Sequence, residues 1–351
     1  MSTVKALAGI PASEAALLAA ARQARIFSGA AWSVGTVDGP LRRGSVGTLS
    51  LDGPPVRPDT LWDLASVTKP VVALAALWLV ERGGLALSET VGDHLPEYRG
   101  GTSGDLTIEQ LLTHTSGLPG RQPLYRQHTD RASLLAALRT LPLRFAPGSA
   151  VEYSSAGFML LGEIVAAASG LPLERLVAMA VTEPLGLRDT GFRPTPDQAG
   201  RCAATEDCPW RGRVVQGSVH DENAEVLGGI AGHAGLFGTV GDMERFAIAV
   251  LSGGSEGWLS ARTLAEAGRS RTDRLTLRRG LGWQGRDASG SPAGDLFSPD
   301  SFGHTGFTGT SVWIDPTLGR YAVLLTNRVH PSRDTPGIET VRWRFHNLAA
   351  R

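Results

Sequence analysis

The chain has 351 residues, of which 42% are hydrophobic and 19% are charged, and its 34 basic and 34 acidic side chains leave no net charge. This is the composition of an ordinary globular protein, long enough for one large domain or two interleaved parts. Because a basic excess is missing, we expect no nucleic acid and no membrane surface as a partner. Oligomeric state is left open.

The N-terminal segment predicts a helix followed by a pair of strands. Ser13 precedes an Ala/Leu-rich amphipathic stretch, and serine is a favourable residue at a helix N-cap. The segment lacks the apolar core of a secretory signal, so we expect a cytoplasmic protein. Residues 26–39 and 41–53 carry β-branched residues broken by Gly and Asp, which predicts an antiparallel hairpin.

From residue 64 to about residue 246, apolar residues recur at three and four spacing and predict a run of helices. The longest apolar stretch, from Val71 to Val80, is about half of what a membrane span needs. Glu81 follows it directly, so we interpret this stretch as a buried helix.

The C-terminal part returns to strands at 311–316 and 321–327 and ends in an amphipathic helix over 337–350. We therefore predict a single α/β (α+β) domain over 1–351. Its antiparallel sheet, flanked by helices, is built from residues 1–63 and 247–351, and a helical lobe is formed by 64–246.

The two cysteines, Cys202 and Cys208, lie close together in one polar segment. They can form a local disulfide or stay as free thiols, and free thiols fit a cytoplasmic chain better. A zinc site would need two more ligands at suitable spacing, and the neighbouring sequence offers none. We expect neither a metal nor an organic cofactor.

The segment Ser66-Val67-Thr68-Lys69 stands where a loop enters the apolar helix, and its three-residue step puts the hydroxyl and the amine on one face. Ser2 to Lys5 matches the same pattern. Only two of the 34 basic residues are lysines, so 32 are arginines. Because arginine cannot give up its proton, Lys69 indicates a place where deprotonation matters. The alternative is a surface lysine after a helix-capping serine.

Two more polar motifs precede apolar segments. Tyr153-Ser154-Ser155 comes just before a predicted helix, where the tyrosine can relay protons. His304-Thr305-Gly306 follows a loop rich in Gly, Ser and Pro, and we expect it to open a strand near a sheet edge. Small residues there would leave room for a substrate and expose backbone N–H groups.

In this order the three motifs resemble those of class C β-lactamases and related esterases and peptidases of the penicillin-binding-protein type. The likeness extends from about residue 15 to 345 and includes the segments 111–120, 145–165, 183–192, 232–247 and 302–316. It implies a β-lactamase/transpeptidase-like fold and a serine hydrolase that forms a covalent acyl-Ser66 intermediate.

The resemblance also implies roles for single residues. Ser66 would be the nucleophile, Lys69 and Tyr153 the general-base and proton-relay pair, and the N–H groups of Ser66 and Phe307 the oxyanion hole. Substrate would be bound by a further group of residues, Ser155, His304, Thr305, Gly306 and Phe307. The substrate would be a small-molecule ester, amide or peptide-like compound.

Two departures from the family pattern bear on that substrate. Ser155 stands where the family commonly has Asn, which weakens recognition of an amide group. His304 replaces the usual Lys, and histidine is mostly neutral at pH 7. Both changes favour esters or small amides over β-lactams. Three alternatives stay open: an acyltransferase or cyclising thioesterase, a β-lactamase, or a catalytically silent binding module.

The segment from His220 to Asn223 is unusually polar for its glycine-rich surroundings. It either borders the substrate pocket or forms a loop turn bonded to itself. We expect His114 and His233 to be structural hydrogen-bonding residues rather than catalysts.

Overall fold

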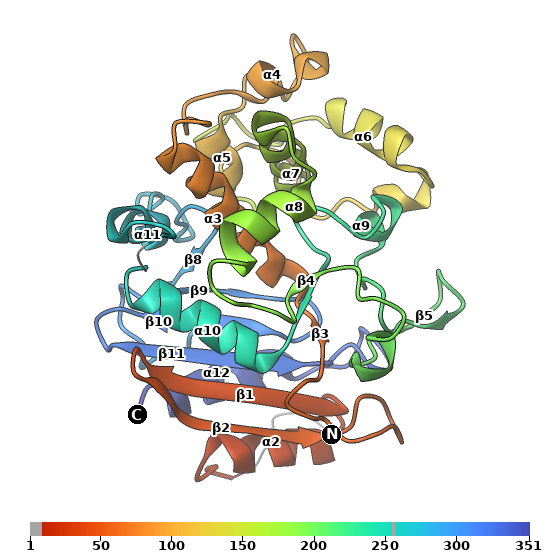
Figure 1. The fold of residues 1–351 in the computed structure, drawn as a ribbon, viewed down its shortest axis with the longest axis vertical. Helices are drawn as coiled ribbons and strands as arrows, with labels where there is room; N and C mark the ends of the chain where they lie inside the picture. Colours follow the sequence, from red (N-terminus) through yellow and green to blue (C-terminus); the bar gives the residue numbers. More distant parts are fainter. Residues whose placement is uncertain (1–8, 255–256) are drawn as a thin grey trace.

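The computed structural model describes residues 9–254 and 257–351, and its centre is an antiparallel sheet. The strands of this sheet are β1 (Gly29–Thr36), β2 (Gly39–Gly47), β8 (Gln284–Gly285), β9 (Phe302–Thr305), β10 (Ser311–Asp315) and β11 (Arg320–Thr326). The six strands lie in the order β2-β1-β11-β10-β9-β8 (Figure 1). Both ends of the chain therefore contribute to one sheet, and the predicted fold class is confirmed.

Alternation along the strands gives the sheet two apolar faces. Trp32 and Val34 of β1 belong to one hydrophobic core, whereas Val323 and Leu325 of β11 belong to the other. The first face is covered by α2 (Glu14–Gln23) and α12 (Ile338–Ala349), and Ser13 caps α2 as expected. The second is covered by α10 (Val240–Leu251), so this helix, which crosses the expected boundary at residue 246, packs on the sheet (Figure 1).

The remaining helices gather beyond α10 and the second face of the sheet (Figure 1). They are α3 (Thr68–Glu81), α4 (Val91–His94), α5 (Ile108–Leu112), α6 (Arg131–Arg139), α7 (Ser155–Ser169), α8 (Leu173–Val177), α9 (Glu222–Val226) and α11 (Ala261–Gly268). Short turns of other helix types are η1 (Ala65–Val67), η2 (Pro96–Tyr98), η3 (Leu124–Arg126), η4 (Ala178–Thr182) and η5 (Ala199–Arg201). The central pair, α3 and α7, is apolar almost all round and buried.

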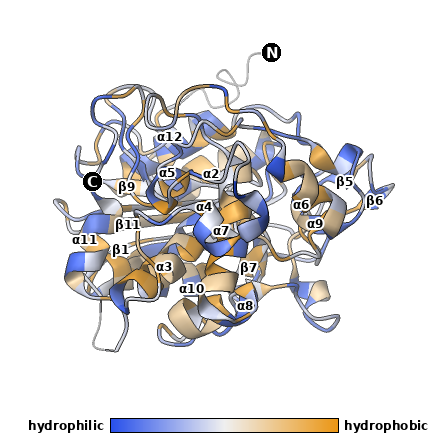
Figure 2. Ribbon diagram, turned by 90° about the horizontal axis from the view of Figure 1, so that it is seen from above, coloured by the Kyte–Doolittle hydropathy of each residue, from blue (hydrophilic) through white to orange (hydrophobic). Residues whose placement is uncertain are grey.

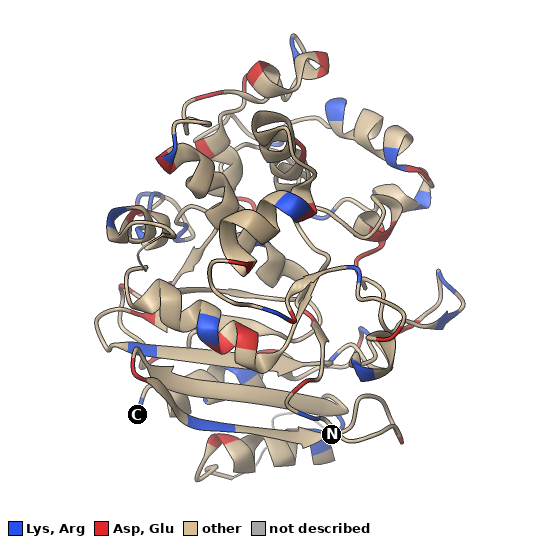
Figure 3. Ribbon diagram, viewed as in Figure 1, with Lys and Arg blue, Asp and Glu red and all other residues tan. Residues whose placement is uncertain are grey.

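Among the described residues, no single helix has the length and apolar character to cross a membrane. One bent pair, Ser155–Ser169 with Leu173–Thr182, meets that test of length and composition together, with a bend of 79° between its parts. Acidic and basic residues are interspersed over the sheet and the helical region (Figure 3).

Short strands lie within the region predicted to be helical and directly before it. A small three-stranded sheet is made of β3 (Trp62–Asp63), β4 (Gly191–Phe192) and β7 (Leu236–Gly238). A separate hydrophilic hairpin, formed by β5 (Asp207–Cys208) and β6 (Arg213–Val214), projects from the molecule (Figure 2). Strands of two or three residues are too short to show a period of two, so no alternation of apolar and polar residues indicates them.

The position of the His304 motif differs from the expectation. His304 and Thr305 end strand β9 rather than opening a strand, and β10 begins only at Ser311. A β-carbon added at Gly306 would lie 2.0 Å from Thr310 Oγ1 and 2.6 Å from the Leu64 carbonyl oxygen. A side chain at Gly306 would therefore clash with the segment before Ser66. The chain turns here from β9 into β10, and the Gly306 N–H donates to the Thr310 carbonyl oxygen at 2.8 Å.

Candidate active site

The nucleophile candidate lies in a tight turn between a strand and a helix. Ser66 is the middle residue of η1, between β3 and α3. Ala65 before it has a φ of +48°, a left-handed conformation that costs a residue with a β-carbon about 1 kcal/mol or more. Asp63 supports this turn by accepting a hydrogen bond from the Ala65 N–H at 2.8 Å. Burial raises the pKa of Asp63, against the opposing effect of hydrogen bonds from His220 and Ala65.

Lys69 is fully buried one helical turn after Ser66. Its Nζ donates to Ser66 Oγ at 3.1 Å and to the carbonyl oxygen of His233 at 3.0 Å. The contact expected from the three-residue spacing is therefore present. A buried amine in contact with a serine hydroxyl is the arrangement that proton removal from Ser66 requires.

Tyr153 packs beside this pair from the loop that enters α7. Its ring centre lies 4.8 Å from Lys69 Nζ, 4.7 Å from the His114 ring and 5.8 Å from the His304 ring. The hydroxyl is buried and has no hydrogen-bond partner within the described part of the chain. Tyr153 also lines the cavity beside Ser66, so a polar group bound there is the partner that this hydroxyl lacks.

Both neighbouring histidines are held as neutral rings. His114 Nδ1 accepts from the Ser154 N–H at 3.1 Å, and burial, together with Arg279 and Lys69, lowers its pKa well below the usual range. His304 Nδ1 lies 2.8 Å from the Thr305 carbonyl oxygen, and burial and Lys69 likewise lower its pKa. His114 has the structural role expected of it. His304 supplies no positive charge at neutral pH.

The candidate oxyanion hole is tied to the nucleophile turn by threonine hydroxyls. Thr308 Oγ1 donates to the Asp63 carbonyl oxygen at 2.7 Å, and Thr310 Oγ1 donates to that of Leu64 at 2.9 Å. Phe307 lies between β9 and these anchors, and its N–H has no acceptor among the described residues. The two N–H groups of Ser66 and Phe307 therefore belong to one rigid assembly, as stabilisation of an oxyanion demands.

Ser66 opens into a cavity of about 290 Å³. Of the residues expected to bind substrate, Ser155 and Phe307 line it, together with Ser66 and Tyr153. The cavity is completed by Ala65, Gly120, Arg121, Gln122, Pro123, Tyr125, His220, Asp221, Glu222, Asn223, Ala234 and Arg333. Its lining does not include His304, Thr305 or Gly306, so His304 packs behind Tyr153 instead of contacting the cavity.

The polar segment from His220 to Asn223 borders the cavity and is not a turn bonded to itself. The His220 N–H donates to Asp63 Oδ2 at 2.6 Å, and Asp221 Oδ1 lies 2.9 Å from His233 Nε2. The Asn223 side chain accepts a hydrogen bond from the Tyr125 N–H in η3 and donates one to the Gln122 carbonyl oxygen in the loop before η3. Burial alone would raise the pKa of Asp221, but His233 lowers it well below the usual range. The His233 carbonyl oxygen also accepts the hydrogen bond from Lys69, and a structural role for this residue stays a prediction.

The two cysteines are buried free thiols, and burial raises the pKa of Cys202 to about 12. Cys208 lies with Glu206 and Glu222 in a group whose ligand atoms are all within 4.8 Å of one another. Neighbouring sequence did not reveal this grouping. The guanidinium group of Arg333 forms ion pairs with both glutamates of this group. A side chain of the protein therefore supplies the positive charge between the two carboxylates.

These features are those of a serine hydrolase. Ser66 contacts a buried lysine, and a tyrosine hydroxyl without a partner and a fixed backbone N–H lie beside the same cavity. The family model described as Beta-lactamase matches residues 15–344, and the chain belongs to this family. A relative from Salmonella enteritidis PT4, named "Putative D-alanyl-D-alanine carboxypeptidase", is 34% identical over 318 residues, which cover 80% of this chain and 72% of the relative. The protein is therefore a serine hydrolase of the penicillin-binding-protein and β-lactamase type.

Solved structures agree with this fold. A β-lactamase from Mycobacterium bovis is 26% identical, with a TM-score of 0.59 over 86% of this chain and 88% of that one. Simvastatin synthase (LovD) from Aspergillus terreus is 22% identical, with a TM-score of 0.76 over 95% of this chain and 96% of that one.

Proposed function

We propose that this enzyme hydrolyses esters or small amides, including peptide-type amides, through a covalent acyl-Ser66 intermediate. The observation that carries the proposal is the 3.1 Å contact between Lys69 Nζ and Ser66 Oγ at the edge of the cavity. Ser66 Oγ attacks the substrate carbonyl carbon while Lys69 and Tyr153 take its proton and pass it to the leaving group. The N–H groups of Ser66 and Phe307 bind the oxyanion, and water then releases the acid and restores the Ser66 hydroxyl.

Two features support esters and small amides over β-lactams. The cavity wall carries the short hydroxyl of Ser155, which lacks the two-sided hydrogen bonding of an asparagine amide. His304 is buried and neutral, so the cationic side chain that this position commonly has in the family is missing here. The peptidase name of the Salmonella relative supports a peptide-like substrate as one member of this class.

The test is hydrolysis of a short-chain p-nitrophenyl ester by the purified enzyme and by Ser66→Ala. We expect turnover that Ser66→Ala abolishes. Undiminished turnover in that variant would disprove the mechanism. Product analysis in the presence of competing amines separates hydrolysis from acyl transfer, because a transferase forms an amide in preference to the acid. Comparing the ester with a cephalosporin measures the preference against β-lactams.

A further inference from the structure

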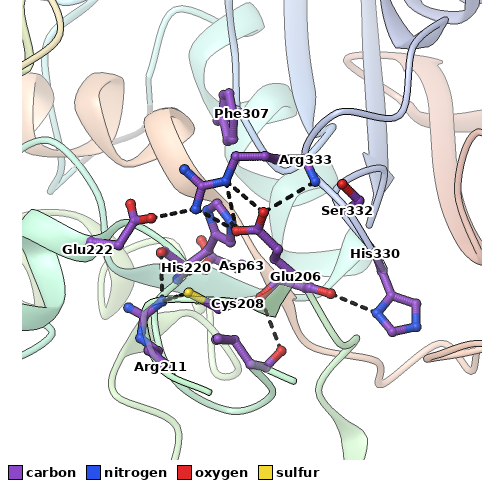
Figure 4. A network of polar contacts seen from close by, with 12 residues as sticks. Asp63, Glu206, Cys208, Arg211, His220, Glu222, Phe307, His330, Ser332 and Arg333 are labelled. Atoms are coloured by element: carbon purple, nitrogen blue, oxygen red, sulfur yellow. Dashed lines mark hydrogen bonds and ion pairs between the residues drawn. The ribbon is translucent and has the colours of Figure 1, made fainter. Parts of the chain in front are cut away.

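An arginine that sequence reasoning did not single out lines the same cavity as Ser66. Arg333 follows β11, and its Nε lies 2.7 and 2.8 Å from the two carboxylate oxygens of Glu206 (Figure 4). Its Nη2 bonds Glu206 and also Glu222 Oε1. A guanidinium held by two carboxylates is fixed in position and orientation.

The support for Arg333 is itself rigid. The side chain of Glu206 is only 4% exposed and lies 3.0 Å from His220 Nε2. Burial alone would raise the pKa of Glu206, but hydrogen bonds from His220 and Arg333 bring it down to about 2. The Phe307 ring stacks on His220 at 5.6 Å and faces the Arg333 guanidinium at 5.9 Å. These groups form one preorganised wall of the cavity.

Two charged side chains of this wall each have one atom without a hydrogen-bond partner among the described residues. Among the hydrogen bonds of the described residues, Arg333 uses Nε and Nη2 but not Nη1, and Glu222 uses Oε1 but not Oε2. Figure 4 shows both unused ends on the side of the ion pair toward Phe307, which lines the cavity. Neither atom is among the described side-chain atoms that are fully buried without a partner, and Arg333 and Glu222 both line the cavity. The cavity therefore offers a cationic donor beside an anionic acceptor.

We infer that Arg333 and Glu222 form a subsite for a zwitterionic α-amino-acid group of the substrate. The substrate carboxylate would accept from Arg333 Nη1, and its ammonium group would donate to Glu222 Oε2. An uncharged, apolar group there would remove water from Arg333 Nη1 and Glu222 Oε2 without forming hydrogen bonds to them, which is unfavourable. A zwitterion forms a hydrogen bond with each of these atoms and adds no net charge. The inference rests on the proposed function and names its substrate class: esters or amides that carry a free amino-acid end away from the scissile carbonyl.

The probes are p-nitroanilides that differ only in the two charged groups. The D and L forms of γ-glutamyl-p-nitroanilide carry both charges, glutaryl-p-nitroanilide lacks the ammonium group, and 4-aminobutyryl-p-nitroanilide lacks the carboxylate. A second set has one more methylene group, so the charged groups lie farther from the carbonyl that Ser66 attacks. In kcat/KM the wild-type enzyme should favour the zwitterion over each single-charge analogue by about tenfold or more.

The variants should separate the two charges. Glu222→Gln should erase the preference over the glutaryl analogue and keep the preference over the aminobutyryl analogue, because Glu206 still holds Arg333. Arg333→Lys should have the opposite effect. Arg175→Leu removes an exposed ion pair with Glu183, outside the cavity lining, and should change neither preference.

The outcomes distinguish this inference from the proposed function. If the short ester is cleaved in a Ser66-dependent way but neither probe length shows a preference for the zwitterion, the subsite is overturned and the hydrolase proposal stands. If no substrate acylates Ser66, the hydrolase proposal fails. Calorimetry with Ser66→Ala then decides on the subsite, because the zwitterionic anilide should bind about tenfold more tightly than either analogue, and equal binding would overturn it.

Discussion

Replacing Arg333 with leucine should destabilise the protein because it leaves the Glu206 carboxylate buried without its main partner. The side chain of Glu206 is 4% exposed, and its pKa of about 2 compares with an ordinary value of 4.5. This lowering corresponds to about 3 kcal/mol of stabilisation of the charged form, which Arg333 shares with His220. Breaking a buried ion pair from one side costs about 3 to 5 kcal/mol. We therefore expect Arg333→Leu to lower the free energy of unfolding by roughly 2 to 4 kcal/mol at pH 7.

The pH dependence has a definite sign. A carboxyl group whose pKa is lowered by folding stabilises the native state fully above its unfolded value, and that stabilisation is lost as the pH falls toward the folded value. For Glu206 this interval runs from about 4.5 to about 2. Between pH 5 and pH 3 the wild type should lose more of its unfolding free energy than Arg333→Leu does.

Urea unfolding followed by circular dichroism measures both effects. Arg175→Leu is the matched control, because its partner Glu183 is exposed and 3.5 Å away. Losing that pair should change stability by at most about 1 kcal/mol. Adding Glu206→Gln to Arg333→Leu should recover most of the loss, because the unpaired charge is then removed. If Arg333→Leu costs no more than Arg175→Leu at pH 7, the argument for the buried pair is refuted.

Three further predictions concern catalysis. Lys69→Arg introduces a side chain that stays protonated and cannot accept a proton from Ser66, so kcat/KM for a p-nitrophenyl ester should fall roughly a thousandfold; a fall of less than tenfold would contradict the assigned role. Tyr153→Phe removes a hydroxyl with no hydrogen-bond partner in the described residues, so kcat should fall about a hundredfold while the unfolding free energy does not decrease. Parallel losses of both would indicate a structural tyrosine. Gly306→Ala places a β-carbon 2.0 Å from Thr310 Oγ1 and should displace the Phe307 N–H, lowering kcat about a hundredfold; wild-type kcat would show that this N–H is not used.

The parts of the site that sequence could predict are those set by local geometry. Ser66 and Lys69 meet because three residues make nearly one helical turn. Tyr153 comes just before α7, a helix that the three and four spacing of its apolar residues predicts. The strands β1, β2, β10 and β11 were predictable because they contain β-branched or apolar residues and are bounded by turn-forming residues.

What sequence could not predict depends on contacts between distant segments. Arg333 and Glu206 are 127 residues apart, and nothing in either local pattern indicates that they meet at the cavity. The same holds for Asp63, which joins the nucleophile turn to His220. The expectation that His304 opens a strand was wrong, because His304 lies near the end of β9 and the chain turns at Gly306 toward β10.

Mass spectrometry of the enzyme after reaction with a fluorophosphonate probe tests directly whether Ser66 is the nucleophile. We expect one covalent adduct on the peptide that contains Ser66 and none in Ser66→Ala. The adduct should form much more slowly in Lys69→Arg. Labelling that persists in Ser66→Ala, or the absence of an adduct on the Ser66 peptide of the folded wild type, would contradict the assignment of Ser66 as the nucleophile.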